Sequence, residues 1–234
     1  MRKVTICACV SRSFIDKEKV AILAAVLKKD GYHISIEADL CKKVMNKSAD
    51  MEDIASGVII ACHPRVILSH LHWLGLEAKQ LLDIRNNGID EILSQIQIPE
   101  AKHLPEKEIY IEQINRFPIE NGVDAWYPVL DKERCIECGK CYDFCLFGVY
   151  AIENKKITVA QPQNCKNNCP ACARMCPSRA IIFPKYEKSP INGGLAEEEQ
   201  FNPQEMDTLY KERLRSRLQQ RRAGVSLIKA VNNK

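Results

Sequence analysis

Residues 135–145, CIECGKCYDFC, and residues 165–177, CKNNCPACARMCP, decide how the second half of this chain folds. Most of the 12 cysteines of the 234-residue chain fall in these two motifs. Two or three residues separate each cysteine from the next, so successive thiolates can converge from one loop onto one metal centre. The first motif supplies Cys135, Cys138, Cys141 and Cys145, and the second supplies Cys165, Cys169, Cys172 and Cys176.

The two motifs closely resemble those of bacterial-type ferredoxins with two [4Fe–4S] clusters, in which the last cysteine of each motif binds the other cluster. The resemblance implies an α+β ferredoxin-like domain over residues 126–187. It assigns one cluster to Cys135, Cys138, Cys141 and Cys176, and the other to Cys145, Cys165, Cys169 and Cys172. A predicted hairpin over residues 150–152 and 156–159, with a strand over 180–183 after the second motif, fits the same fold.

Two departures from the ferredoxin pattern are visible. The second motif has one extra residue between its first two cysteines, and Leu146 replaces the usual proline after the first motif. Neither departure removes a thiolate. Zinc is the alternative metal, because Cys-x2-Cys pairs also form zinc sites, but zinc sites normally have simpler spacing.

The first part of the chain, residues 1–75, is predicted to be a small α/β domain with a parallel sheet. Apolar runs predict strands over residues 4–10, 33–38 and 58–61. A helix is predicted from an Asp16 cap to Gly31, and a shorter one over residues 49–54. This alternation favours parallel strands joined by right-handed crossovers.

The remaining cysteines are Cys7, Cys9, Cys41 and Cys62, and each lies near the end of a predicted strand or just after it. The carboxyl ends of parallel strands lie side by side and form the usual binding crevice. Cys7 and Cys9 also share strand parity, which predicts that both side chains point to one face. Two hypotheses stay open: these cysteines bind a third cluster, or they are structural or redox-active thiols.

This region resembles the N-terminal domain of the flavin-containing subunit of heterodisulfide reductase. The matching segments are ICACVSRSFID at 6–16, ADLC at 38–41 and VIIACHPR at 58–65. The resemblance implies a third [4Fe–4S] cluster bound by the four N-terminal cysteines. That family also carries a flavin domain, but this sequence contains no Gly-x-Gly-x-x-Gly motif and only 10 glycines, so FAD and NAD are not predicted.

The other segments give less specific information. Residues 70–98 have helical periodicity, and residues 76–125 are predicted to form a helical connector. Residues 188–234 are predicted to be a loop and a C-terminal helix with Met206, Tyr210, Leu214 and Leu218 on one stripe. We expect that stripe to pack on its own domain or on a partner protein, and its basic residues make nucleic acid the less favoured alternative.

Composition excludes several classes of protein. Hydrophobic residues make up 46% of the chain and charged residues 27%, which is ordinary for a globular protein. No apolar run is long enough to span a bilayer, and so many cysteines suit metal binding in a reducing cytoplasm. The formal net charge of +4 ignores the negative charge of bound clusters, so it gives no support for nucleic-acid binding.

Function follows from the cysteine motifs, because no catalytic Ser–His–Asp constellation or paired carboxylates stand out. We predict a cytoplasmic iron–sulfur protein or subunit that relays single electrons between a low-potential donor and a partner oxidoreductase, with flavoenzymes among the candidates. Two alternatives stay open. One is a catalytic subunit of a heterodisulfide-reductase-like enzyme, and the other is an iron–sulfur redox sensor.

Overall fold

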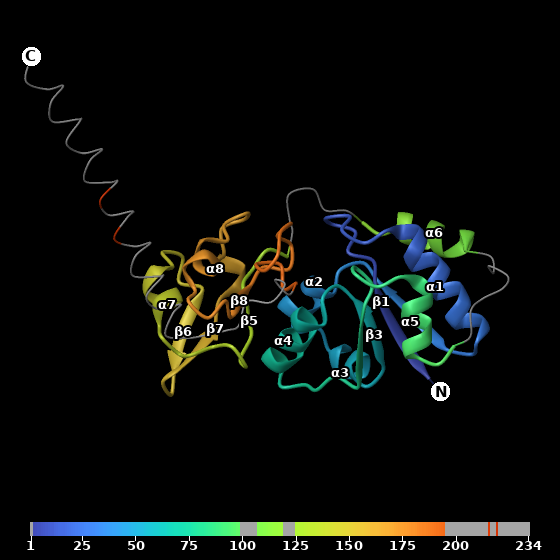
Figure 1. Cartoon of the computed structure of the whole chain (residues 1–234), viewed down its shortest axis with the longest axis horizontal. Helices are drawn as coiled ribbons and strands as arrows, with labels where there is room; N and C mark the ends of the chain where they lie inside the picture. Colours follow the sequence, from blue (N-terminus) through green and yellow to red (C-terminus); the bar gives the residue numbers. More distant parts are fainter. Residues whose placement is uncertain (1, 99–106, 119–124, 195–214, 216–218, 220–234) are drawn as a thin grey trace, which may run out of the picture.

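The computed structural model describes residues 2–98, 107–118 and 125–194, together with positions 215 and 219. Figure 1 shows two lobes side by side, an N-terminal lobe drawn in blue to green and a C-terminal lobe drawn in yellow to orange. Apart from positions 215 and 219, the predicted C-terminal helix lies outside the described residues. Within the part of the chain that is described, no helix is long and apolar enough to cross a membrane.

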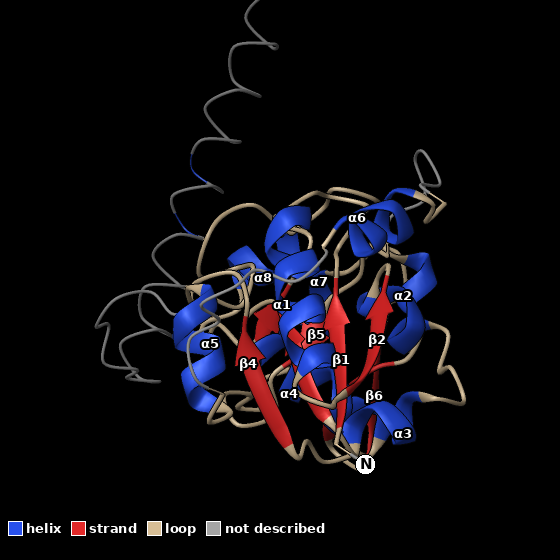
Figure 2. Ribbon diagram, turned by 90° about the vertical axis from the view of Figure 1, so that its right-hand side faces the viewer, coloured by secondary structure: helices blue, strands red, loops and turns tan. Residues whose placement is uncertain are grey.

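A four-stranded parallel sheet forms the centre of the N-terminal lobe. Its strands are β1 (Lys3–Cys7), β2 (His33–Glu37), β3 (Val58–Ala61) and β4 (Gln80–Asp83), in the order β2-β1-β3-β4 (Figure 2). Consecutive residues such as Ile59 and Ile60 are both buried, as expected for a sheet covered on both faces. In this strand order the chain runs from β1 to β2 on one side and then returns past β1 to β3 and β4 on the other. The neighbouring strands β1 and β3 therefore mark the topological switch point of the sheet.

The predicted helix over residues 70–98 is wrong in its middle part. Residues Gln80–Asp83 form β4, which pairs with β3, and helix is found only on either side. The run Leu81, Leu82 and Ile84 matches helical spacing when combined with later isoleucines. A short apolar run cannot distinguish a buried strand from a helix, and here pairing with β3 decides the outcome.

Helices connect and cover these strands. They are α1 (Lys17–Lys29), α2 (Leu40–Met45), α3 (Met51–Ala55), α4 (Pro64–Leu74), α5 (Ile89–Gln95) and α6 (Glu108–Asn115). Asp16 caps α1 as predicted, because its side chain accepts a hydrogen bond from the Glu18 backbone N–H at 2.9 Å. The sequence did not predict α2, a six-residue helix that begins shortly after β2.

Short elements make up the C-terminal lobe. Strand β5 (Val129–Leu130) pairs with β8 (Ile181–Ile182), and β6 (Tyr150–Glu153) pairs with β7 (Lys156–Val159) in the predicted hairpin. Two five-residue helices, α7 (Lys140–Phe144) and α8 (Ala171–Met175), lie within the cysteine motifs, and a 3-10 turn (Pro162–Asn164) precedes the second motif.

The two lobes are joined by contacts between buried side chains. Tyr127 and Ile182 belong to the C-terminal segment, yet they pack in the hydrophobic core of the N-terminal lobe. The Tyr127 hydroxyl donates a 2.7 Å hydrogen bond to the Cys41 carbonyl oxygen. Arg65 of α4 donates to Asp131 Oδ2 at 2.6 Å and to the Arg179 carbonyl at 2.5 Å. These buried bonds fix the C-terminal lobe against α4 and α2.

Candidate iron–sulfur sites

The first group of cysteines gathers around α7 and α8. Cys141 lies in α7, and Cys176 caps the carboxyl end of α8. Burial, followed by the negative charge of Cys176, raises the pKa of Cys141 to about 12, and Cys135 and Cys138 act in the same direction. The structure thus brings together the four residues that the ferredoxin resemblance assigns to one cluster, although Cys176 comes from the second motif.

A second group forms from the other four cysteines of the motifs. Burial raises the pKa of Cys165 to about 12, with further contributions from the negative charges of Cys169 and Cys145. Burial also raises the pKa of Cys172 to about 12, and the negative charges of Cys165 and Cys145 act in the same direction. The Cys172 sulfur accepts a 3.1 Å hydrogen bond from the Tyr150 hydroxyl. Cys145, although it belongs to the first motif, therefore lies close to the cysteines of the second group.

The extra residue of the second motif is accommodated by a left-handed turn at Asn168, whose φ is 58°. Asparagine tolerates this conformation better than most residues. Asn168 Oδ1 also accepts a 2.7 Å hydrogen bond from Arg12 of the N-terminal lobe. The enlarged loop is thus a contact between the lobes, which spacing alone did not predict.

The third group lies at the switch point of the parallel sheet. Cys7 ends β1, Cys62 follows β3, and Cys41 lies in the first turn of α2 after β2. Burial, then the charge of Cys9, raises the pKa of Cys7 to about 12. Burial also raises the pKa of Cys62 well above its usual range, followed by the charges of Cys7 and Cys9. These four thiols, from three strand–loop units, are close enough to influence one another.

Cys9 reaches this group by a different route from the one predicted. Strand β1 ends at Cys7, and Cys9 adopts a left-handed backbone with φ of 47°. Its carbonyl oxygen accepts backbone hydrogen bonds from Arg12 at 3.3 Å and Ser13 at 3.1 Å. The parity argument was therefore wrong, because a turn rather than a strand directs the Cys9 side chain.

A buried lysine that the sequence analysis missed completes the N-terminal group. Lys185, which follows β8, is only 2% exposed. Its Nζ lies 3.3 Å from Cys9 Sγ, 2.9 Å from Ser11 Oγ and 2.7 Å from Asp39 Oδ2. Burial opposes its charge, but the negative charges of Cys41, Asp39, Cys9 and Cys7 outweigh burial and hold the pKa of Lys185 well above its usual range. No motif surrounds this residue in the sequence.

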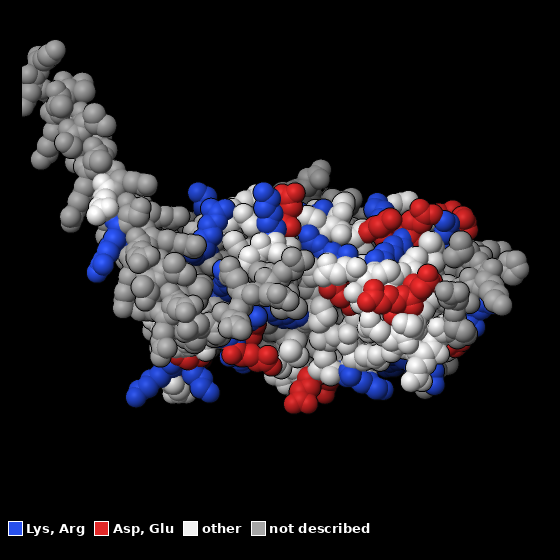
Figure 3. Space-filling model, viewed as in Figure 1, with Lys and Arg blue, Asp and Glu red and all other residues white. Residues whose placement is uncertain are grey.

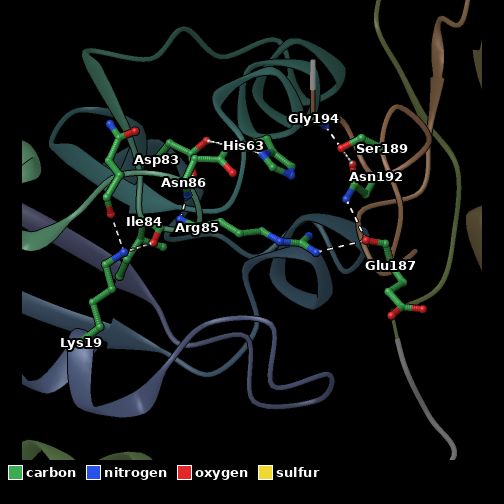
Figure 4. A network of polar contacts seen from close by, with 11 residues as sticks. Lys19, His63, Asp83, Ile84, Arg85, Asn86, Glu187, Ser189, Asn192 and Gly194 are labelled. Carbon is green, nitrogen blue, oxygen red and sulfur yellow. Dashed lines mark hydrogen bonds and ion pairs between the residues drawn. The ribbon is translucent and has the colours of Figure 1, made fainter. Parts of the chain in front are cut away.

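A polar network holds the segment that carries Lys185 against the sheet (Figure 4). Asp83 at the end of β4 accepts a hydrogen bond from the Asn86 side chain at 2.8 Å and lies 3.3 Å from His63 Nδ1. Arg85 then reaches the Glu187 carbonyl at 3.3 Å. Gly193 packs so closely on α4 that a Cβ atom there would lie 2.4 Å from Val66 Cγ2.

The chemistry of these three groups fits iron–sulfur clusters. Each group supplies four thiols, which is the ligand number of a cubane. Burial raises the pKa of several of these thiols, so a metal must displace their protons, and cluster binding provides the free energy for that step. They are Cys7, Cys41, Cys62, Cys135, Cys141, Cys165 and Cys172. Among the described residues, no three His, Cys, Asp or Glu side chains are arranged for a single metal ion. A cubane spreads its four ligands over separate iron atoms.

Comparison with known proteins identifies the family. No protein-family model matches the chain. The chain is 35% identical over 129 residues to the uncharacterized ferredoxin MJ0251 of Methanocaldococcus jannaschii, a match covering 50% of this chain and 85% of that protein. It is 35% identical over 88 residues to Ferredoxin-3 of Nostoc sp., covering 28% of this chain and 90% of that protein.

A third relative is pyruvate synthase subunit PorD of M. jannaschii, which is 33% identical over 73 residues, or 30% of this chain and 84% of that protein. Each match covers most of the relative but half or less of this chain, so this chain contains additional sequence. Since the chain covers most of two ferredoxins at 35% identity, it belongs to the ferredoxin family and is an iron–sulfur electron carrier.

Proposed function

We propose that this chain relays single electrons through three [4Fe–4S] clusters between a low-potential donor and a partner oxidoreductase. Each cluster, when bound, would accept and donate one electron at a time. Two clusters would be bound by the C-terminal groups and the third by Cys7, Cys9, Cys41 and Cys62. Resemblance of residues 6–65 to the flavin-containing subunit of heterodisulfide reductase supports the third assignment.

The position of Cys165 carries this proposal. Its side chain packs against the hydrophobic core of the N-terminal lobe and also against the core of the C-terminal lobe. Cys165 belongs to the second group, which supports placing the second cluster between the first cluster and the N-terminal group. Such an order gives each electron a continuous path along the molecule rather than two separate sites.

The residues around each group would hold the cluster and limit its exposure to water. The Ala180 backbone N–H donates to Cys176 Sγ at 3.3 Å, and the Tyr150 hydroxyl donates to Cys172 Sγ. Hydrogen bonds to sulfur stabilise the more negative, reduced state of a cluster and so raise its potential. Binding a cluster through thiolates needs no general base, which agrees with the lack of an evident catalytic constellation in the sequence. This chain would therefore act as an electron-transfer component.

An apolar surface around the first motif suits a protein redox partner. Cys138 is exposed, and so are large apolar side chains near it in sequence, among which Leu146 is 92% exposed. The others are Ile136, Tyr142, Phe144, Phe147 and Ile152. Lys and Arg are interspersed with Asp and Glu over the face drawn in Figure 3. These features favour an oxidoreductase over a nucleic acid as the partner.

The first test is iron and acid-labile sulfide per chain on anaerobically purified protein, with EPR after dithionite reduction. We expect about twelve iron and twelve sulfide. About eight would overturn the third assignment and leave the N-terminal cysteines as structural or reactive thiols. Zinc with little iron would overturn the relay as a whole.

Two matched variants then assign the clusters to the groups. Cys7→Ser combined with Cys41→Ser should remove one EPR signal and about four iron, leaving the two ferredoxin-type signals unchanged. Cys138→Ser should alter a different signal and leave the N-terminal one intact. If both variants changed the same signal, the separate N-terminal site would be wrong.

A further inference from the structure

Lys185 places a buried positive charge in a site built almost entirely by the other lobe. The cysteines around it come from β1, α2 and the loop after β3, whereas Lys185 follows β8. Its side chain is 1% exposed, and that of its ion-pair partner Asp39 is 9% exposed. Removing an ammonium group from water is costly, so a buried lysine needs negative charge nearby.

Asp39 balances the charge of Lys185 when no metal is bound, and its other contacts are with uncharged groups. Asp39 also caps α2 through the Lys42 backbone N–H at 3.3 Å and accepts a 2.9 Å hydrogen bond from the Ser11 hydroxyl. A cubane with four thiolates carries a net charge of about −2 when oxidised and gains one more negative charge on reduction. The Lys185 ammonium, in contact with Cys9 Sγ, is placed to stabilise that additional charge.

We propose that Lys185, a residue of the C-terminal lobe, is a positioning residue that raises the reduction potential of the N-terminal cluster. The inference rests on the proposed third cluster. Lys185 is not a ligand and acts through charge and the hydrogen bond to Cys9. The potential of the N-terminal cluster would then depend on a residue from the C-terminal lobe.

Redox titration followed by EPR tests this inference on the full chain. Lys185→Gln should shift the midpoint of the N-terminal signal to a more negative potential and leave the two ferredoxin-type midpoints unchanged. Lys188→Gln is the matched control, because Lys188 is an exposed lysine three positions further along. It should leave every midpoint where it is. Lys185→Arg should shift this midpoint less than Lys185→Gln does, since arginine keeps the positive charge.

Asp39→Asn gives a second measurement that loss of structure would not mimic. Removing this negative charge should shift the same midpoint in the opposite direction, to a less negative potential. General damage to the site would move both variants the same way. If Lys185→Gln does not fold, the direction of the midpoint shift in Asp39→Asn still gives the sign of the charge effect at this site.

The outcomes separate this inference from the proposed function. About twelve iron in the parent, with no midpoint shift in Lys185→Gln or Asp39→Asn, would overturn the role of Lys185 and keep the three-cluster relay. About eight iron in the parent would overturn both. Shifts of opposite sign confined to one of three signals would establish the role of Lys185.

Discussion

The two lobes assemble their cysteine groups in contrasting ways. In the C-terminal lobe, the cysteines come from two short motifs, and several of them are members of a small hydrophobic core or pack against it. In the N-terminal lobe, the cysteines come from separate strand–loop units at the edge of a sheet whose core is formed largely by aliphatic residues. From this comparison we expect the C-terminal lobe to need bound clusters in order to fold, and the N-terminal lobe to fold around its own core without one.

Removal of iron is the strongest way to test this contrast. Chelation under anaerobic conditions should cost the C-terminal lobe its structure, because its small core cannot bury enough apolar surface by itself. The parallel sheet should persist. Hydrogen exchange measured by segment should show protection lost over β6 and β7 and retained over β1 and β3. Equal loss of protection in both lobes would contradict the contrast.

The junction of the lobes should depend strongly on Arg65. Arg65→Gln removes the nearer cationic partner of Asp131, which is 6% exposed, and leaves only Arg134 Nε at 4.0 Å. The change should lower the free energy of unfolding by about 3 kcal/mol. Urea denaturation measures the change. The control is Arg116→Gln, whose pair with Glu112 is 80% and 69% exposed and should contribute less than about 0.5 kcal/mol. Similar losses in the two variants would show that Arg65 does not hold the junction.

Acid should weaken the N-terminal lobe through His70. Burial lowers the pKa of His70 to about 3, and neither ring nitrogen has a hydrogen-bond partner within the described part of the chain. In the unfolded chain His70 has a pKa near 6.5 and binds a proton below that pH, whereas in the folded lobe it stays neutral. The free energy of unfolding therefore falls as pH drops below about 6.5.

At pH 5 this linkage should cost about 2 kcal/mol relative to neutral pH. His70→Leu should remove that part of the pH dependence, measured by urea denaturation at pH 7 and pH 5. A parent and a variant with the same difference between the two pH values would show that His70 is not responsible.

A smaller effect is expected for the hydrogen bond that links Tyr127 to the Cys41 carbonyl. Tyr127→Phe leaves that buried acceptor without its partner and should cost about 1–2 kcal/mol. Tyr142→Phe is the control, because Tyr142 is 46% exposed and its change should stay within about 0.5 kcal/mol. An unchanged denaturation midpoint in Tyr127→Phe would mean that packing alone positions Cys41.

The sequence by itself determined the features whose information is local. Tight spacing within residues 135–145 and 165–177 identified the cysteines that gather in the C-terminal lobe. Apolar runs located β1, β2 and β3 to within a few residues, and Asp16 marked the start of α1. Each of these depends on neighbours along the chain, so composition and periodicity were sufficient.

Only the tertiary structure decided the features that depend on distant residues. Pairing with β3 made Gln80–Asp83 a strand, and a left-handed turn directed Cys9. Lys185 reached Cys9 because β8 pairs with β5 and places the following residues at the switch point of the other lobe's sheet. The residues that surround Lys185 come from segments far away in sequence, so no local sequence pattern predicts which groups its ammonium will contact.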